Sequence, residues 1–210
     1  MSTTLAEISD EPVCLDGLGS ELRIRLGETA EEMRARFNEF LEHNPELIVE
    51  QDPSGEIIVM SPAGASSARS NSEIARQLGN WAIEYGGWTF DSSAMFILPN
   101  GAKRSPDAAW ISAERWDALP PEQREKFPSM APDFVLELRS KTDRLMALKT
   151  KMQEYIDNGV RMAWLVDPQL RQVHVYQNGK APEMLDQPGT VSGAEVLPGF
   201  VLETARIYAS

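Results

Sequence analysis

The chain has 210 residues, of which 42% are hydrophobic and 25% are charged. That length supports one sizeable hydrophobic core, and that composition is typical of a soluble globular protein. The formal net charge of −12 argues against a general polyanion-binding protein. A local basic cluster or a bound divalent cation can still hold a phosphate on such a surface.

The apolar runs, the cysteine content and the histidine content exclude several other protein classes. No apolar run reaches the ~18 residues of a membrane span, and the N-terminus lacks the basic and apolar regions of a secretory signal. Cys14 is the single cysteine, which excludes an internal disulfide and a cysteine-rich zinc site. His43 and His174 are the two histidines, and neither has a second ligand nearby. We therefore expect a cytoplasmic protein with no membrane partner.

The hydrophobic patterning predicts a mixed α/β chain, with a loose arm over residues 1–20 and a single domain over residues 21–210. Strands are predicted at Glu21–Leu26, Glu46–Glu50, Glu56–Met60, Trp88–Leu98 (one strand or two), Ser105–Ile111, Pro132–Arg139, Met162–Val166, Gln172–Gln177, Met184–Leu185 and Val201–Ile207. Helices are predicted at Ala30–His43, Ser66–Tyr85, Ala113–Leu119, Pro121–Lys126 and Arg144–Asn158.

Local signals refine three of these segments. Thr29 followed by Glu32 predicts a capping box at the start of the first helix. Asp52 to Gly55 predicts the turn of a hairpin. Ser112 to Met130 is polar and rich in proline, and we expect this insertion to be a flap that faces the substrate.

The strand before Ser140 carries the strongest chemical candidates. Alternation directs Phe134, Leu136 and Leu138 to one face of the strand and Glu137 and Arg139 to the other. A carboxylate and a guanidinium on an apolar strand are costly to desolvate without a partner. The pair therefore either lies at the solvated rim of the sheet or forms half of a metal site.

A second carboxylate, Asp107, is predicted on the upstream strand that also follows a proline. If the two strands lie side by side, Asp107 and Glu137 provide the oxygen ligands that Mg²⁺ prefers. The main-chain carbonyl of Leu138 could supply a further oxygen, with water and phosphate completing the coordination.

Other charged residues near these strands remain open. Lys149 and Lys151 flank the apolar stripe of their helix on opposite sides, so helical geometry does not choose between them, and each is also compatible with a surface lysine. Glu73 borders the packed face of its helix, as either a surface glutamate or a ligand at the edge of a metal site. Glu50, at a strand end, is a weaker candidate.

The tryptophans argue against a carbohydrate cleft. Trp81, Trp110 and Trp164 lie in periodic apolar segments and are predicted to be core residues, while Trp116 is left open. A two-carboxylate glycosidase would need exposed aromatic residues, which these segments do not provide.

From Asn44 to Phe200 the sequence resembles the Uma family of proposed endonucleases, a branch of the PD-(D/E)XK nuclease superfamily. The matching stretches are IVMSP, NSEI, FDSSAMFILPNG, RSPDAAW, PDFVLELRSKTD, KMQEYIDNGVRMAWLVDP, VHVY and SGAEVLPGF. The resemblance implies a restriction-endonuclease-like α/β core, in which a mixed central sheet is flanked by helices.

The resemblance also assigns candidate roles. It makes Pro106 and Asp107 the PD pair and Glu137 the acidic position of the motif, while Arg139 stands where the superfamily has lysine. Arginine stays protonated and is a poor general base. In many members of the superfamily the lysine lies on the following helix, where Lys151 is its counterpart, and Glu73 corresponds to a helical acid found in some members.

The activity implied is hydrolysis of DNA phosphodiester bonds by a Mg²⁺- or Mn²⁺-dependent endonuclease. Asp107, Glu137 and Leu138, with Glu73 at the edge, would hold the metal, Lys151 would position water and Arg139 would contact the scissile phosphate. A homodimer is expected by analogy. The alternative is a catalytically inactive protein that uses the nuclease fold for binding or regulation, which the acidic charge and the arginine at the lysine position favour.

Overall fold

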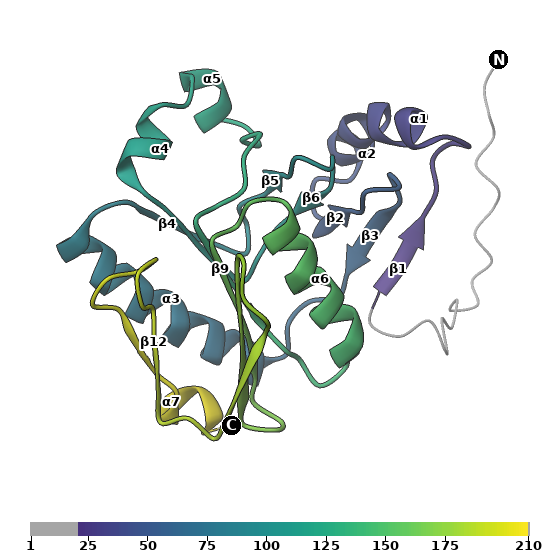
Figure 1. The fold of residues 1–210 in the computed structure, drawn as a ribbon. Coiled ribbons are helices and arrows are strands. Elements are labelled where there is room, and N and C mark those ends of the chain that lie inside the picture. Colours follow the sequence, from purple (N-terminus) through teal and green to yellow (C-terminus); the bar gives the residue numbers. More distant parts are fainter. Residues whose placement is uncertain (1–20, 210) are drawn as a thin grey trace, which may run out of the picture.

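The computed structural model describes residues 21–209, so the arm predicted for residues 1–20 lies outside the described residues (Figure 1). The elements in chain order are β1 Glu21–Ile24, α1 Ala30–Ala35, α2 Phe37–His43, β2 Val49–Gln51, β3 Ile57–Met60, α3 Ala65–Tyr85, β4 Trp88–Asp91, β5 Phe96–Ile97, β6 Lys103–Arg104, β7 Ala108–Ile111, α4 Ala113–Asp117, α5 Pro121–Arg124, β8 Phe134–Leu138, α6 Leu145–Asp157, β9 Met162–Asp167, β10 Gln172–Gln177, β11 Glu183–Asp186, β12 Thr190–Ser192, β13 Val201–Glu203 and α7 Ala205–Tyr208.

The larger sheet has the strand order β11-β10-β9-β8-β7-β4. Strands β8 and β9 pair in parallel and the other neighbours pair antiparallel, so the sheet is mixed as expected. Helix α6 connects the parallel pair, as a crossover connection must. Helix α3 and the C-terminal segment pack on one face of this sheet and α6 packs on the other.

Strand β8 distributes its side chains between these two faces as the alternation predicts. Phe134 and Leu136 pack in the core that α3 covers, while Val135 packs in the core that α6 covers. Phe134 is completely buried and meets Trp164 of β9 edge to face, with 5.0 Å between ring centroids. Burial on both faces explains why β8 reads as a continuous apolar run around a single glutamate.

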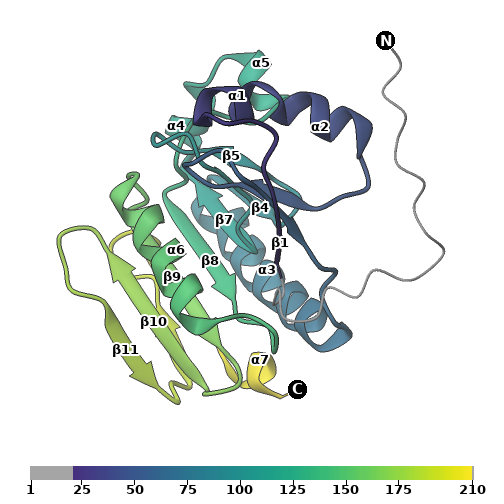
Figure 2. The ribbon, with the colours of Figure 1, turned by 90° about the vertical axis from the view of Figure 1, so that its right-hand side faces the viewer.

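The smaller sheet has the order β1-β3-β2-β6-β5 and lies with α1 and α2 beside the large sheet, on the side of α6 (Figures 1 and 2). The predicted hairpin is present, because β2 and β3 pair antiparallel with Glu50 opposite Ile58. Gly55 takes a positive φ of 93° in its turn, as a tight hairpin turn requires. Phe37, Ile57 and Met95 are buried in a third, smaller core beneath this sheet.

Two predicted segments differ from the structure. The helix expected over Ala30–His43 is broken at Arg36, whose side chain leaves the helix surface to donate a hydrogen bond to the Leu26 carbonyl at 2.6 Å. The strand expected over Val201–Ile207 ends at Glu203, and the chain turns into α7. The Ile207 carbonyl there accepts a hydrogen bond from Ser70 of α3, and the Ile207 side chain is completely buried.

Other local predictions are confirmed. The capping box of Thr29 and Glu32 is present in both directions. Trp81, Trp110 and Trp164 are buried, and Trp116 packs at the edge of the core under α6. Across residues 21–209, none of the helices combines the length and apolar character that crossing a bilayer requires.

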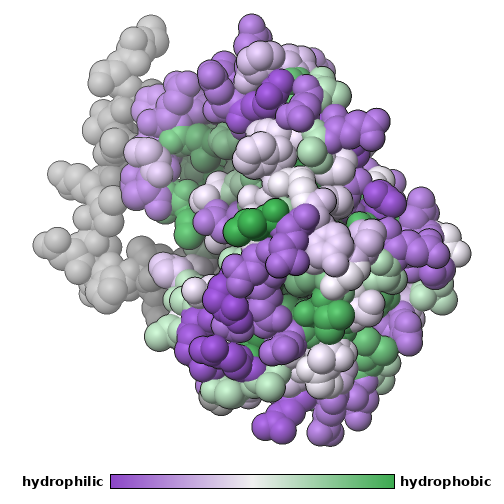
Figure 3. All heavy atoms as spheres, turned by 90° about the vertical axis from the view of Figure 1, so that its left-hand side faces the viewer, coloured by the Kyte–Doolittle hydropathy of each residue, from purple (hydrophilic) through white to green (hydrophobic). Residues whose placement is uncertain are grey.

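The surface on the left of Figure 1 carries hydrophobic side chains in separate small patches among hydrophilic ones (Figure 3). Exposed apolar residues include Ile83 and Tyr85 of α3 and Trp88 of β4. Apolar residues scattered in this way are ordinary on soluble proteins and identify no particular partner.

Candidate active site

The pairing of β7 with β8 brings the two candidate carboxylates together. Asp107 directly precedes β7, whose residue Ala108 lies opposite Leu136, so Asp107 lies opposite Glu137. One Asp107 oxygen accepts the Leu138 backbone N–H at 2.7 Å, and the other accepts the Asn71 side-chain amide at 2.9 Å. Asp107 is therefore held in a fixed position at the end of the sheet.

Helix α6 supplies the lysine of this cluster, which is Lys151 and not Lys149. The Nζ atom of Lys151 lies 2.8 Å from Oε1 of Glu137 and 2.9 Å from Oε1 of Glu50. Lys149 is half-buried on another side of α6 and does not line the cleft described below. Tyr155, one turn further along α6, donates its hydroxyl to the same Glu137 oxygen at 2.8 Å.

Glu50 is the residue that the sequence analysis undervalued. This buried side chain of β2 accepts the Ser105 backbone N–H at 2.8 Å and pairs with Arg104 at 2.9 Å, in addition to Lys151. Arg104 in turn pairs with Glu154 of α6 at 2.7 Å. The available signal was a carboxylate, Glu50, that continues an apolar strand, where it would be costly to bury without a partner.

Both Asp107 and Glu137 are harder to ionise than usual. Burial raises the pKa of Glu137 to about 7 and also raises that of Asp107. Lys151 opposes the rise at Glu137, but the nearby charges of Asp107 and Glu50 add to it.

Glu50 and Lys151, in contrast, remain charged despite their burial, because each lies beside groups of opposite charge. Burial disfavours the charge of Glu50, but Lys151 and Arg104 outweigh that cost and lower its pKa. Burial likewise opposes the charge of Lys151, yet Glu137 and Glu50 raise its pKa above the usual value. Lys151 is therefore a protonated hydrogen-bond donor near neutral pH.

The cluster contains more acidic than basic groups. When all four carboxyl groups of Glu50, Asp107, Glu137 and Glu154 are ionised, they outnumber the two cationic side chains of Arg104 and Lys151. A divalent cation would neutralise this difference, and carboxylates are the ligands that Mg²⁺ and Mn²⁺ prefer. Asp107 and Glu137 therefore fit a divalent ion.

Few side chains are available to hold such an ion. Within residues 21–209, no group of three or more His, Cys, Asp or Glu side chains is arranged to hold a metal ion. A strand residue directs its N–H and its C=O to the same side, and the Leu138 N–H points to Asp107. The Leu138 carbonyl thus faces the side where a cation between the two carboxylates would need a third oxygen.

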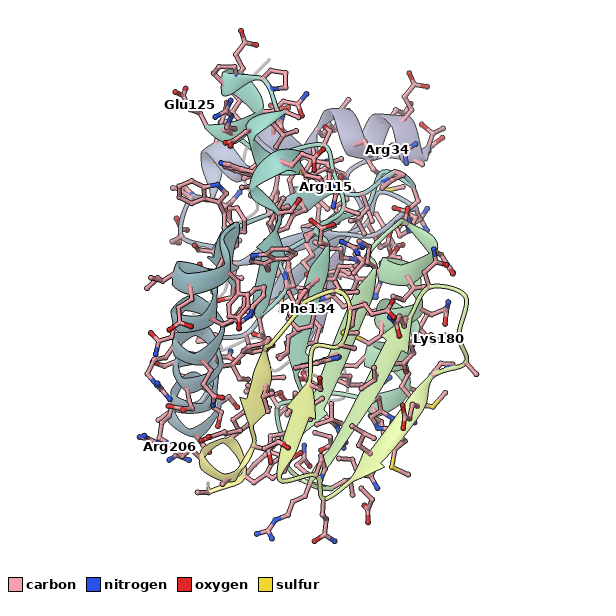
Figure 4. All side chains as sticks on the ribbon, turned by 60° about the vertical axis from the view of Figure 1, so that its left-hand side comes forward. Arg34, Arg115, Glu125, Phe134, Lys180 and Arg206 are labelled. Atoms are coloured by element: carbon pink, nitrogen blue, oxygen red, sulfur yellow. The ribbon has the colours of Figure 1, made fainter. Side chains whose placement is uncertain are left out.

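Two predicted site residues have other partners. Arg139 lines the cleft, but its guanidinium pairs with the completely buried Asp167 at 2.8 Å. Glu73 is not brought into the cluster, because its carboxylate is bound by Arg76 and Gln77 of its own helix. Arg206 of α7 lies 3.8 Å from Glu73, and Figure 4 shows Arg206 at the lower end of the molecule. Asn71 is the residue of α3 that reaches the site.

The cluster forms the floor of a cleft of about 1110 Å³ between the small sheet, the start of α3 and the start of α6. The segment Ser112–Met130, predicted to be a flap over the substrate, contributes no residue to the lining of this cleft. Its helices α4 and α5 project from the top of the molecule, where Arg115 and Glu125 are seen in Figure 4. The prediction of its helices is confirmed, but its expected position over the cleft is wrong.

A solved structure found by comparison shares this architecture. A crystal structure described as "a putative nuclease belonging to DUF820" from Anabaena variabilis matches with a TM-score of 0.69 and 20% sequence identity, over 87% of this chain and 98% of that one. A DrdV–DNA complex matches with a TM-score of 0.39 and 14% identity, over 75% of this chain and 12% of that one.

Sequence comparison identifies the family. No curated protein matches the chain. Residues 34–205 match the family Uma2, which is described as "Putative restriction endonuclease". These residues span most of the chain, including the whole six-stranded sheet, every strand of the five-stranded sheet except β1, and every member of the charged cluster. The protein belongs to the Uma2 family.

Proposed function

We propose that this protein is a Mg²⁺- or Mn²⁺-dependent nuclease that hydrolyses DNA phosphodiester bonds in the cleft above Asp107 and Glu137. The observation that carries the proposal is the meeting of the buried Glu137 and the half-buried Asp107 with Lys151, which pairs with Glu137 at 2.8 Å. The family description and the restriction-endonuclease-like fold support the same reaction class.

Asp107 and Glu137, with the Leu138 carbonyl, would hold the ion. A divalent ion bound there would lower the pKa of a bound water and stabilise the negative charge that develops on the phosphate. The hydrogen bonds from Asn71 and from the Leu138 backbone fix Asp107, so its free lone pairs have a defined direction. Tyr155 similarly orients Glu137.

Lys151 acts as a donor rather than as a base in this proposal. Its raised pKa keeps it protonated, and Glu50 and Glu137 hold its ammonium group at the floor of the cleft. A fixed ammonium group in a buried site stabilises an oxyanion more strongly than the same group in water. Arg139 neutralises Asp167, so we assign it to holding the end of β8 instead of to the phosphate.

The test is cleavage of plasmid and oligonucleotide DNA with Mg²⁺, Mn²⁺ or chelator. Asp107→Asn and Glu137→Gln should abolish metal-dependent cleavage, and Lys151→Met should reduce it by about 100-fold or more, since one fixed donor to a developing oxyanion contributes that much. Lys149→Met is the matched control, because this lysine lies on the same helix outside the cleft lining, and it should retain full activity.

The second candidate is a nuclease-fold protein that binds without cutting. The net charge of −12 and the pairing of Arg139 with Asp167 favour it. Absence of cleavage on every DNA form, together with Mg²⁺ binding that Asp107→Asn leaves unchanged in calorimetry, would establish this alternative and refute the nuclease.

We further propose that the protein is a homodimer, from the family resemblance alone, and that it is cytoplasmic, from its single cysteine. Sedimentation equilibrium of the full chain tests the assembly, and a single species of monomer mass at micromolar concentration would refute it. Fractionation of cells that express the protein tests the location.

A further inference from the structure

The charged floor of the cleft is deeply set. The side chains of Glu137 and Lys151 are 6% and 13% exposed. A scissile phosphate must therefore move down between the small sheet and α6 to reach the atoms that would act on it. A cleft of about 1110 Å³ is similar in volume to the pockets that hold single small molecules, so it has room for a few nucleotides but not for a turn of double helix.

The walls above this floor are largely apolar. Alternation along β3 sends Ile57 and Val59 into the small core, while Ile58 and Met60 line the cleft. Ile48 also lines the cleft and is 53% exposed, although a large apolar side chain gains nothing from contact with water. On the opposite wall, α6 contributes Leu148.

Duplex and unpaired DNA differ in what they present to such walls. A duplex keeps its base faces in the stack and presents phosphates and the edges of base pairs. An unpaired strand exposes base faces, which stack on aromatic side chains with little dependence on sequence. The same faces can also be removed from water against aliphatic side chains. Apolar walls above a charged floor therefore match exposed bases above a phosphate.

The pairing of the basic residues in the cleft also favours an unpaired strand. Of the five basic side chains that line it among residues 21–209, four are paired with carboxylates, namely Arg23, Arg104, Arg139 and Lys151. Lys141 is the fifth. Paired and unpaired strands are both held through their phosphates by lysine and arginine. Among residues 21–209 the cleft lining offers few unpaired cations, so contacts to bases must contribute a larger share of the binding.

We propose that the substrate of this site is unpaired DNA, either a single strand or the unpaired part of a flap, bubble or frayed end. The bases lie against Ile48 and Met60 while one phosphate reaches Lys151 and the two carboxylates. This inference rests on the proposed function for the cleavage step, but the preference for unpaired strands concerns binding and can be measured separately.

The experiment compares end-labelled DNA of one sequence as a single strand, a continuous duplex, and a duplex with an unpaired flap, in Mn²⁺. The single strand and the flap should be cut several-fold faster than the duplex, with flap cleavage in or next to the unpaired part, because only unpaired bases present their faces to Ile48 and Met60. Cleavage within the continuous duplex at the same rate would overturn the inference.

A pair of isoleucine variants tests the apolar wall. Ile48→Ser should raise KM for the single strand several-fold and leave kcat unchanged. Ile83→Ser is the matched control, because Ile83 is 84% exposed on α3 and lies outside the cleft lining. Equal KM values for the two variants would count against contact between bases and Ile48.

The preference for unpaired DNA can be tested even if the proposed nuclease activity is not found. If no DNA form is cut, the nuclease proposal fails, and fluorescence anisotropy in Ca²⁺ still tests the inference with a labelled oligo-dT strand and its duplex with oligo-dA. Tighter binding of the single strand that Ile48→Ser weakens supports the inference, and equal or tighter binding of the duplex overturns it.

Discussion

Glu137→Gln should make the metal-free protein more stable at alkaline pH. Glutamine has the shape of glutamate and keeps an oxygen that accepts from Tyr155 and Lys151, so the packing and both contacts are preserved. The change removes a charge that burial disfavours and that Asp107 and Glu50 repel. Functional sites often carry such a cost in stability.

The magnitude follows from the pKa of Glu137, which is raised from 4.5 to about 7 in the folded protein. A raised carboxyl pKa means that stability is complete below pH 4.5 and is lost as the pH rises from there to about 7. At about pH 8 the loss amounts to about 3 kcal/mol, because one pKa unit corresponds to about 1.4 kcal/mol. Glu137→Gln should recover up to this amount at pH 8 and almost none near pH 4.5.

The assay is urea unfolding of both proteins in chelator at the two pH values. Glu73→Gln is the control of opposite sign, because a hydrogen bond from Arg76 lowers the pKa of Glu73 and its charge stabilises the folded state above pH 4.5. That variant should lose stability at pH 8. A Glu137→Gln protein that is no more stable than the parent at pH 8, or whose gain does not change with pH, would refute the reasoning.

Three further predictions concern the scaffold and are measured by urea unfolding. Phe134→Ala should cost about 3–5 kcal/mol, since this ring is completely buried against Trp164; a loss below 1 kcal/mol would show that the core collapses around the gap. Gly87→Ala should destabilise the protein by more than about 1 kcal/mol, because Gly87 has a φ of 82° and a Cβ there would lie 2.3 Å from the Trp110 ring nitrogen. Gly79→Ala is the control and should stabilise the protein by about 0.5–1 kcal/mol, because Gly79 lies inside α3 with open space around it. Equal effects of the two substitutions would contradict this contrast. Thr29→Ala should cost about 1 kcal/mol by removing the cap of α1, and Thr29→Asn, which can cap the helix, should restore most of it.

The parts of the fold that were predictable are those in which local pattern decides the structure. The alternation along Phe134–Leu138 predicted which residues enter each core, and the stripe of Arg144–Asn158 predicted α6 to within one residue at each end. The position of Asp107 opposite Glu137 was expected for two acids near apolar strands that each follow a proline, provided that the strands pair, and they do. Such signals predict the structure because the spacing of apolar residues within one strand or helix shows which side chains share a packed face.

The parts that were not predictable depend on which segments meet. Nothing in the sequence near Glu50 indicates that Lys151 will lie 2.9 Å away. Helical geometry alone left Lys149 and Lys151 as alternatives, and Lys151 was favoured by the family resemblance. The helices of Ser112–Met130 were predicted correctly, but their place away from the cleft depends on where β7 and β8 lie in the sheet. At Thr204 the contact of α7 with Ser70 overrides the apolar alternation that favoured a strand.

The network around Glu50 also has a consequence for how the protein folds. It joins β2, the segment after β6, β8 and α6, which are far apart in the sequence, and contacts of long sequence separation form late because loop closure must precede them. The charged cluster is therefore complete only when both sheets are in place, and loss of the small sheet would leave Lys151 and Arg104 each without one carboxylate partner, that of Glu50.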